Sequence, residues 1–416
     1  MSVPTMQVLV GFQSTTGFGA PFLLNDAFYG VLDTAGRGTL GGVTFVDLTS
    51  LVENVSITRG RSRQLDQFNA GTATIAFDNS SQILNPSNTS SPYYPFVLPR
   101  CPVQVLANGI PIYTGLVTDW NLDYDISNED MMYASCADQF TVLANQVLNS
   151  HTTAQESSGT RIARALGYAE IVYQGPTSID VGSSTLGGTA DSVDFSISQD
   201  TNFLNYLQLV NTSEQGYLYM SAAGTLTFKG RSSVLNPVAG ATFNTDGTGL
   251  PYQTLINQFG DELLYNWIVG KSPAGVSQTS TDPESIALYQ TQNYNLLDLL
   301  NSTTSEVAGL TAYLLGKYHN PVLRFTGLST QLAALSSANQ NIVLGLDVTD
   351  ICSVVKNFVV GTPATETQTL IVSGIAHNIT PGSHIVSYTF ESTDGNQYLT
   401  LDDAIFGTLD YNLLSF

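Results

Sequence analysis

The stretch from Gly71 to Asn79, GTATIAFDN, constrains the fold most, because its apolar side chains recur at every second position. Ala73, Ile75 and Phe77 fall on one face of an extended chain, and threonines occupy the other face. A helix would spread these side chains around its circumference, whereas a strand collects them on one side. We therefore predict a half-buried strand here.

A β-hairpin is predicted downstream, in PVQVLANGIPIYTG (residues 102–115). Val103 and Val105 alternate into the Asn108–Gly109 pair, which is a strong signal for a two-residue hairpin turn. Similar patterns extend over residues 6–143. Many short antiparallel strands separated by turn signals are typical of a barrel or a sandwich.

Helical periodicity appears in the middle of the chain. GTRIARALGYA (residues 159–169) and DTNFLNYLQLVNTSEQG (residues 200–216) place apolar side chains three or four positions apart. The strongest helix signal is TTSEVAGLTAYLLGKYHNP (residues 303–321), in which Thr303 and Glu306 form a predicted capping box. Strand patterns return after this helix. The pattern therefore predicts a mainly β fold with α+β insertions.

The charge balance is acidic. The 416 residues include 13 Lys+Arg and 34 Asp+Glu, for a formal net charge of −21. Sequence-specific binding to nucleic acid needs a basic face, so we do not expect it, although an acidic channel could still let DNA slide past. Charged residues make up only 11% of the chain, against a usual value of about 25%, and neutral polar surfaces of this kind suit large assemblies.

Targeting and redox signals are sparse. The chain contains no apolar run of about 18 residues, so we expect no membrane-spanning helix, and no signal peptide is expected at the N-terminus. Cys101, Cys136 and Cys352 are widely spaced and form no CxxC motif. We predict buried, reduced thiols in a protein made in the cytoplasm.

Residues with catalytic or metal-binding spacing are not apparent. His377 and His384 flank a predicted turn and could approach each other, but they lack a third ligand. The adjacent acids Glu129–Asp130 and Asp261–Glu262 could serve glycoside hydrolysis, although adjacent acids on loops are more often solvated. We therefore predict no catalytic residue, no cofactor site and no metal site, and a protein that is not an enzyme.

Positive charge is concentrated at Arg59, Arg61 and Arg63, just before the predicted strand. In an extended chain these side chains would project to one side at intervals of about 6.7 Å, and Gly60 allows a bend. Their partners could be acids of the same chain, carboxylates of a neighbouring subunit, or nucleic acid. We favour a neighbouring subunit, because arginine binds carboxylates in a bidentate manner.

An internal repeat links the two ends of the chain. LNDAFYGVLD (residues 24–33) matches LDDAIFGTLD (residues 401–410) in its Leu, Asp, Ala and Gly positions. Either turn-forming residues coincide by chance, or two related β modules carry the same docking segment. The second interpretation makes six residues candidate interface residues: Asp26, Gly30, Asp33, Asp403, Gly407 and Asp410.

Several stretches, in order, resemble the minor tail proteins of long, non-contractile-tailed phages of actinobacteria. The first is SITRGRSRQLDQFNAGTATIAFDNSSQILNPSNTSSPYY, with an Arg-rich turn, an F.AGTATI.FDN strand and a P.N..SPYY segment. The others are GIPIYTGLVTDWNLDYD, SEQGYLYMSAAGTLTFKGR, GVSQTSTDPESIALY, VSGIAHNITPGSHIVSYTF and LDDAIFGTLDYNLL. The ordered set covers most of the chain.

The resemblance implies a central tail hub, similar to baseplate hub proteins. Two tube-like antiparallel β-barrel modules would flank mixed α+β modules, and three copies would form a pseudo-sixfold ring. The implied modules are residues 1–143 (first tube-like β-barrel), 144–232 (α+β insertion), 233–318 (second mixed module ending in a helix), 319–394 (second tube-like β-barrel) and 395–416 (C-terminal docking tail).

The implied role is structural. A homotrimeric hub would adapt the tail tube and the distal tail protein ring to the tip proteins, and it would line the channel used for DNA ejection. The implied partners are further copies of the chain, the distal tail protein ring, the tape measure protein and other tail-tip or receptor-binding proteins. DNA would pass transiently and without specificity, and no stable membrane insertion is implied. The implied location is the tail tip of the virion, after synthesis in the host cytoplasm.

Two other classes stay open at this point. One is a tail-associated enzyme that degrades the cell wall, although no segment has catalytic spacing. The other is a carbohydrate-binding receptor protein, for which surface aromatic residues such as Tyr93 and Tyr94 could serve.

Overall fold

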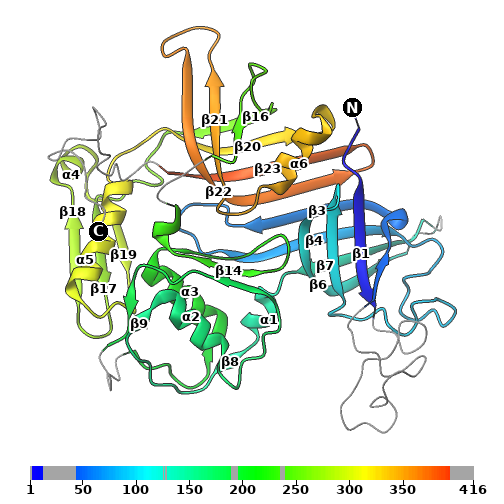
Figure 1. Cartoon of the computed structure of the whole chain (residues 1–416), viewed down its shortest axis with the longest axis horizontal. Helices are drawn as coiled ribbons and strands as arrows, with labels where there is room; N and C mark the ends of the chain where they lie inside the picture. The colour runs from blue at the N-terminus through cyan, green and yellow to red at the C-terminus, as the bar shows by residue number, and fades with distance from the viewer. Residues whose placement is uncertain are drawn as a thin grey trace.

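The computed structural model describes residues 2–12, 44–124, 126, 129–188, 195–234 and 239–393. The described chain is mainly β and has three parts, which Figure 1 shows together. A large sheet runs across the right and the top of the view. An α+β insertion lies below it, and a small sheet covered by a long helix stands at the left.

The large sheet contains 13 strands in the order β16-β20-β23-β22-β3-β4-β7-β6-β5-β1-β2, with β21 branching from β22 and β15 pairing with β21. Their bounds are β1 (Met6–Phe12), β2 (Thr44–Asp47), β3 (Val52–Gly60), β4 (Asn69–Asp78), β5 (Pro102–Ala107), β6 (Ile110–Asp123), β7 (Met131–Ala137), β15 (Ala241–Phe243), β16 (Thr254–Gln258), β20 (Arg324–Gln331), β21 (Ile351–Asn357), β22 (Thr365–Thr380) and β23 (Ser383–Ser392).

The two β-rich regions of the chain meet in this sheet. β22 pairs antiparallel with β3, so that Ile375 lies opposite Arg59 and Ile379 lies opposite Val55. One continuous apolar core includes buried residues from both regions, such as Ile75 and Phe390. The sequence predicted two tube-like β-barrels, and their closure into barrels stays a prediction.

The first predicted strand and hairpin are confirmed. The stretch that begins at Gly71 lies in β4, and its alternating side chains Ala73, Ile75 and Phe77 are buried. β5 and β6 form the predicted hairpin. Asn108 and Gly109 occupy its turn with φ of 50° and 77°, the two positive values that the favoured mirror-image turn requires.

The α+β insertion follows β7 and has its own core, which includes Phe203, Leu207 and Val210. The helix α3 ends at Glu214, and the next residue, Gln215, caps it with a left-handed φ of 56°. The bounds in this part are α1 (Phe140–Ala144), β8 (Val147–Leu148), β9 (Glu156–Ser157), α2 (Ser158–Leu166), β10 (Thr177–Ile179), β11 (Thr185–Leu186), β12 (Thr201–Asn202), α3 (Phe203–Glu214), β13 (Tyr217–Met220) and β14 (Leu226–Lys229).

The third part, here called the β17–β19 module, packs the predicted long helix against a three-stranded sheet. Thr303 caps this helix as expected, because its hydroxyl accepts a hydrogen bond from the backbone N–H of Glu306. The reciprocal half of the capping box is absent: the Glu306 carboxylate instead accepts from the N–H of Thr185 in β11. The bounds are β17 (Trp267–Lys271), β18 (Ser277–Thr281), α4 (Pro283–Tyr289), β19 (Asn293–Leu296) and α5 (Thr304–Tyr318).

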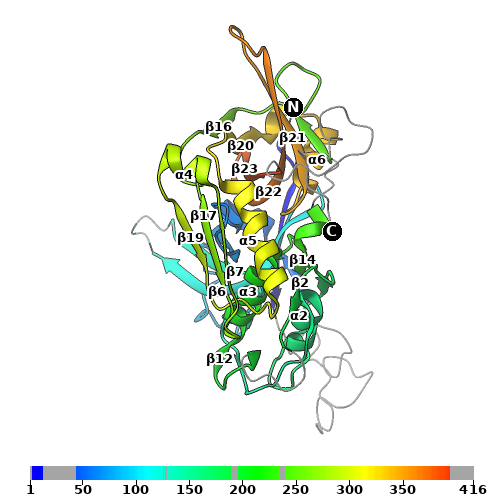
Figure 2. The ribbon, with the colours of Figure 1, turned by 90° about the vertical axis from the view of Figure 1, so that its left-hand side faces the viewer.

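The β21–β22 hairpin projects from the body of the described chain, as the orange arm at the top of Figures 1 and 2. Near its base lies α6 (Ser337–Gly345), and three short 3-10 helices complete the described elements: η1 (Thr49–Leu51), η3 (Arg231–Val234) and η4 (Leu332–Ala334). None of the described helices is long and apolar enough to cross a membrane.

Candidate functional site

Arg59 lies on the inward face of β3, in line with the buried side chains of Val55 and Ile57. Its guanidinium donates to Oδ1 of Asp347 at 2.7 Å, and only 4% of its side chain is exposed. The second oxygen of Asp347 accepts from the backbone N–H of Ala222 in the β13–β14 turn. This ion pair therefore ties the large sheet to the α+β insertion.

The chain turns sharply between Arg59 and Arg61. Gly60 has a φ of +89°, and a Cβ at this position would lie 2.3 Å from the carbonyl oxygen of Ser373. The register of β3 against β4 shifts at the same point. A bulge of this kind breaks the two-residue period, so Arg61 does not continue the face that Arg59 occupies.

Arg61 joins a buried charge cluster with Glu391 and Lys317. Its guanidinium donates to Oε2 of Glu391 and stacks 4.6 Å above the ring of Phe68. Lys317, in the last turn of α5, donates to Oε1 of Glu391 at 2.5 Å. One carboxylate at the end of β23 thus holds cations from two other segments of the chain.

The side chains of Arg61, Lys317 and Glu391 all stay charged. Burial opposes the ionisation of Glu391, but the positive charges of Lys317 and Arg61 outweigh it and lower its pKa to about 2. Burial likewise opposes the charge of Lys317, but the Glu391 carboxylate raises the pKa of Lys317 well above its usual value. Two cations face one carboxylate, so the cluster itself carries one excess positive charge.

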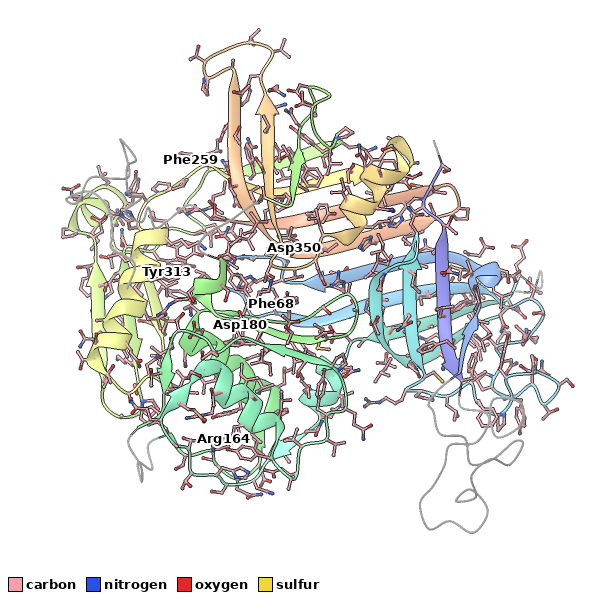
Figure 3. The ribbon with its side chains drawn as sticks, viewed as in Figure 1. Phe68, Arg164, Asp180, Phe259, Tyr313 and Asp350 are labelled. Atoms are coloured by element: carbon pink, nitrogen blue, oxygen red, sulfur yellow. The ribbon has the colours of Figure 1, made fainter. Side chains whose placement is uncertain are left out.

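The cluster lines a cavity of about 200 Å³ where the three parts of the fold meet. Arg61 and Glu391 come from the large sheet, Tyr217 from the α+β insertion, and Tyr313 and Lys317 from the β17–β19 module. Figure 3 marks Phe68 and Tyr313 on two sides of this junction. The geometry indicates a junction that fixes the three parts relative to one another.

Arg63 is the most exposed of the three arginines. Its Nε lies 3.1 Å from Oε1 of Glu262, and both side chains are nearly half exposed. The pair stands at the rim of a groove of about 630 Å³ that also includes Ile256 and Leu328. An exposed pair of this type contributes little to stability.

This placement corrects the predicted interface role of Arg59 and Arg61. The three side chains do not project to one side, because the bulge at Gly60 separates them, and each forms an ion pair with a carboxylate of its own chain. Guanidiniums as enclosed as those of Arg59 and Arg61 cannot also face a neighbouring subunit. For Arg63 the interface role stays a prediction.

The other six predicted interface residues, in the repeat at residues 24–33 and 401–410, lie outside the described residues. His377 and His384 do approach each other: Nδ1 of His377 lies 3.1 Å from Nε2 of His384, and both rings are buried. Burial lowers the pKa of His377 well below its usual value and that of His384 to about 4, so both rings are neutral. Among the described residues, no group of three or more His, Cys, Asp or Glu is arranged to hold a metal ion.

Sequence reasoning missed a second buried carboxylate, that of Glu214 at the end of α3. It is fully buried and accepts hydrogen bonds from the backbone N–H groups of Ser183, Ser184 and Arg231 and from the hydroxyl of Ser158. These bonds hold two loops of the α+β insertion against the helix. The sequence carries no local signal for them, because each partner is at least 17 residues away.

Comparisons with known proteins add information about the fold. No family model matches the sequence, and no curated protein matches it. A tail protein from Neisseria meningitidis MC58 matches the structure with a TM-score of 0.56 at 11% identity, over 93% of this chain and 96% of that one. A 43 kDa tail protein of prophage MuSo2 from Shewanella oneidensis matches with a TM-score of 0.53 at 12% identity, over 85% of this chain and 97% of that one. The chain shares its fold with these two tail proteins.

Both matches extend over nearly the whole of the other chain. The shared architecture therefore includes most of the large sheet and its insertions, rather than one isolated module. The sequence predicted a mainly β fold with α+β insertions, and the structure confirms the mainly β character.

Proposed function

We propose that this protein is a structural component of a phage tail. The observation that carries the proposal is the fold shared with two tail proteins over 85–93% of this chain. The described residues add internal support, because three enclosed arginines each pair with a carboxylate of the same chain: Arg59 with Asp347, Arg61 with Glu391 and Arg161 with Glu156. Their arrangement serves to hold the parts of the fold together.

The specific role that we propose is a trimeric hub at the tail tip. Three copies would form a pseudo-sixfold ring that adapts the tail tube and the distal tail protein ring to the tip proteins. The tape measure protein and receptor-binding proteins would be further partners. The ordered sequence motifs support this role, as does the predicted division into modules 1–143, 144–232, 233–318, 319–394 and 395–416.

The ring would enclose an acidic channel. The net charge of −21 gives the assembly a negative potential, which repels the phosphates of passing DNA. Four cations of the described residues are also buried, so their side chains are not available to bind phosphates: Arg59, Arg161, Lys317 and Arg324. DNA would therefore pass without stable binding.

Labelling of intact particles tests the location. Gold-conjugated antibodies raised against the purified chain are expected to decorate the end of the tail that is distal to the capsid. Label along the whole tube or on the capsid would contradict a tip hub, and its absence from purified virions would contradict a structural tail role. Antibodies against a capsid protein provide the control for access to the particle.

A further inference from the structure

The tip of the β21–β22 hairpin is an exposed apolar surface. Val359 is fully exposed, Val360 is 84% exposed and Phe358 is 40% exposed. Figures 1 and 2 show the hairpin extending away from the rest of the described chain. Three consecutive apolar side chains at the end of a projecting arm indicate a contact with another surface.

The groove beside β16 has the complementary character. Its volume is about 630 Å³, and its apolar lining includes the side chains of Leu328, Tyr388 and Phe390, which are themselves buried, and of Ile256, which is 60% exposed. The charged side chains in its lining are Arg63 and Glu262, which pair with each other. Neutral polar side chains such as Thr254, Gln258 and Ser387 complete the lining, so the groove is partly apolar and its two charges balance each other.

We propose that the hairpin tip of one copy of the chain inserts into the β16 groove of the next copy. This inference rests on the proposed hub ring and names the surfaces that form it. Val359 and Val360 would enter the groove and cover Ile256. Valine suits such a contact, because its branched side chain has few rotamers to lose on burial.

The charge distribution favours a second copy as the occupant. Two copies that each carry −21 repel each other, so they can approach closely only where their surfaces are uncharged or neutralised. The tip meets this condition, because no charged residue occurs between Lys356 and Glu366. The groove meets it as well, because its one acid is paired with its one base.

A contact between the tip and the groove can generate a ring. A projecting tip and a receiving groove are different surfaces of one chain, so their contact is heterologous. Repetition of a heterologous contact produces a closed ring when the rotation between copies closes. A threefold ring would bury all three tips and leave no groove open.

Paired substitutions test the contact in the full-length protein. V359D/V360D adds two negative charges to the tip, and both side chains are exposed, so the fold should be unaffected. The matched control is V172D/V181D, which makes the same change at two valines of the α+β insertion that are 63% and 70% exposed. Light scattering after size exclusion should show three times the 44.5 kDa chain mass for the control, and an affinity for self-association about tenfold or more weaker for the tip variant.

A cysteine pair tests the predicted neighbours directly. In a chain that carries V360C and I256C, mild oxidation should link tip to groove and give a covalent trimer on a non-reducing gel. The native Cys101, Cys136 and Cys352 are buried and should stay reduced. Each single variant should remain unlinked, and efficient V360C-to-V360C linkage would contradict the proposal.

The outcomes separate this contact from the hub role. If the wild-type chain and V359D/V360D both form trimers with equal affinity, the hairpin contact is wrong and the hub ring stands. If the wild-type chain is monomeric at every concentration, the hub ring is wrong and the contact falls with it.

Discussion

Lys317 and Glu391 form the internal contact on which the junction depends: the ammonium group of the first lies 2.5 Å from Oε1 of the second, with both side chains buried. The two residues are 74 positions apart and belong to a helix and a strand of different parts of the fold. Arg61 also pairs with Glu391, so the same carboxylate is the counter-charge of both Lys317 and Arg61.

Removing the carboxylate should destabilise the protein strongly. Glu391→Gln would leave Arg61 and Lys317 buried without a counter-charge, and we expect a loss of about 3–5 kcal/mol in the free energy of unfolding. Glu262→Gln is the matched control, because it breaks an exposed ion pair and should cost about 0–1 kcal/mol. Urea unfolding followed by circular dichroism measures both, and equal losses would contradict the role assigned to the junction.

Arg61 and Arg63 should respond differently to the same substitution. Arg61→Ser removes a buried ion pair and the stacking on Phe68, so we expect a loss of about 1–3 kcal/mol. Arg63→Ser should change stability by about 0–1 kcal/mol, because its partner Glu262 is solvated. As a rim charge, Arg63 should instead alter the salt dependence of assembly. A large loss of stability in Arg63→Ser would show that the groove pair is structural.

The bulge at Gly60 should not tolerate a side chain. Gly60→Ala forces a Cβ toward the carbonyl oxygen of Ser373 and a left-handed φ, whereas Gly109→Ala meets the same type of φ with nothing within 4 Å. We expect about 1–2 kcal/mol of destabilisation at Gly109, and a loss at Gly60 larger by about 1–3 kcal/mol. Thermal unfolding compares the two variants. Equal effects would mean that the neighbouring strand moves aside.

Acid should weaken the fold through the histidine pair. Burial lowers the pKa of His384 to about 4, whereas the unfolded chain protonates near 6.5. The unfolded state therefore binds the proton first, and His384 should remove about 3 kcal/mol of stability as the pH falls from about 6.5 to about 4. His384→Gln does not titrate, so the difference in stability between this variant and the wild type should change over that window. A difference that is independent of pH would contradict the buried, neutral state of His384.

Local patterns predicted the elements, but they did not predict the long-range pairs. β4 and the turn at Asn108–Gly109 follow from residue spacing, because strand alternation and turn conformation are set by near neighbours. The partner of Arg59 is Asp347, which is 288 positions away, and no local pattern encodes that distance. One signal was present: Arg59 continues the buried face of Val55 and Ile57, which indicates an internal guanidinium.

A reconstruction of the tail tip from phage particles tests the central claim most directly. If the protein is the hub, averaging without imposed symmetry should show three copies of this fold in one ring, with six-fold pseudosymmetry around an acidic channel. A single copy per particle, a ring of six identical copies, or a channel wall lined mainly by Lys and Arg would contradict the account.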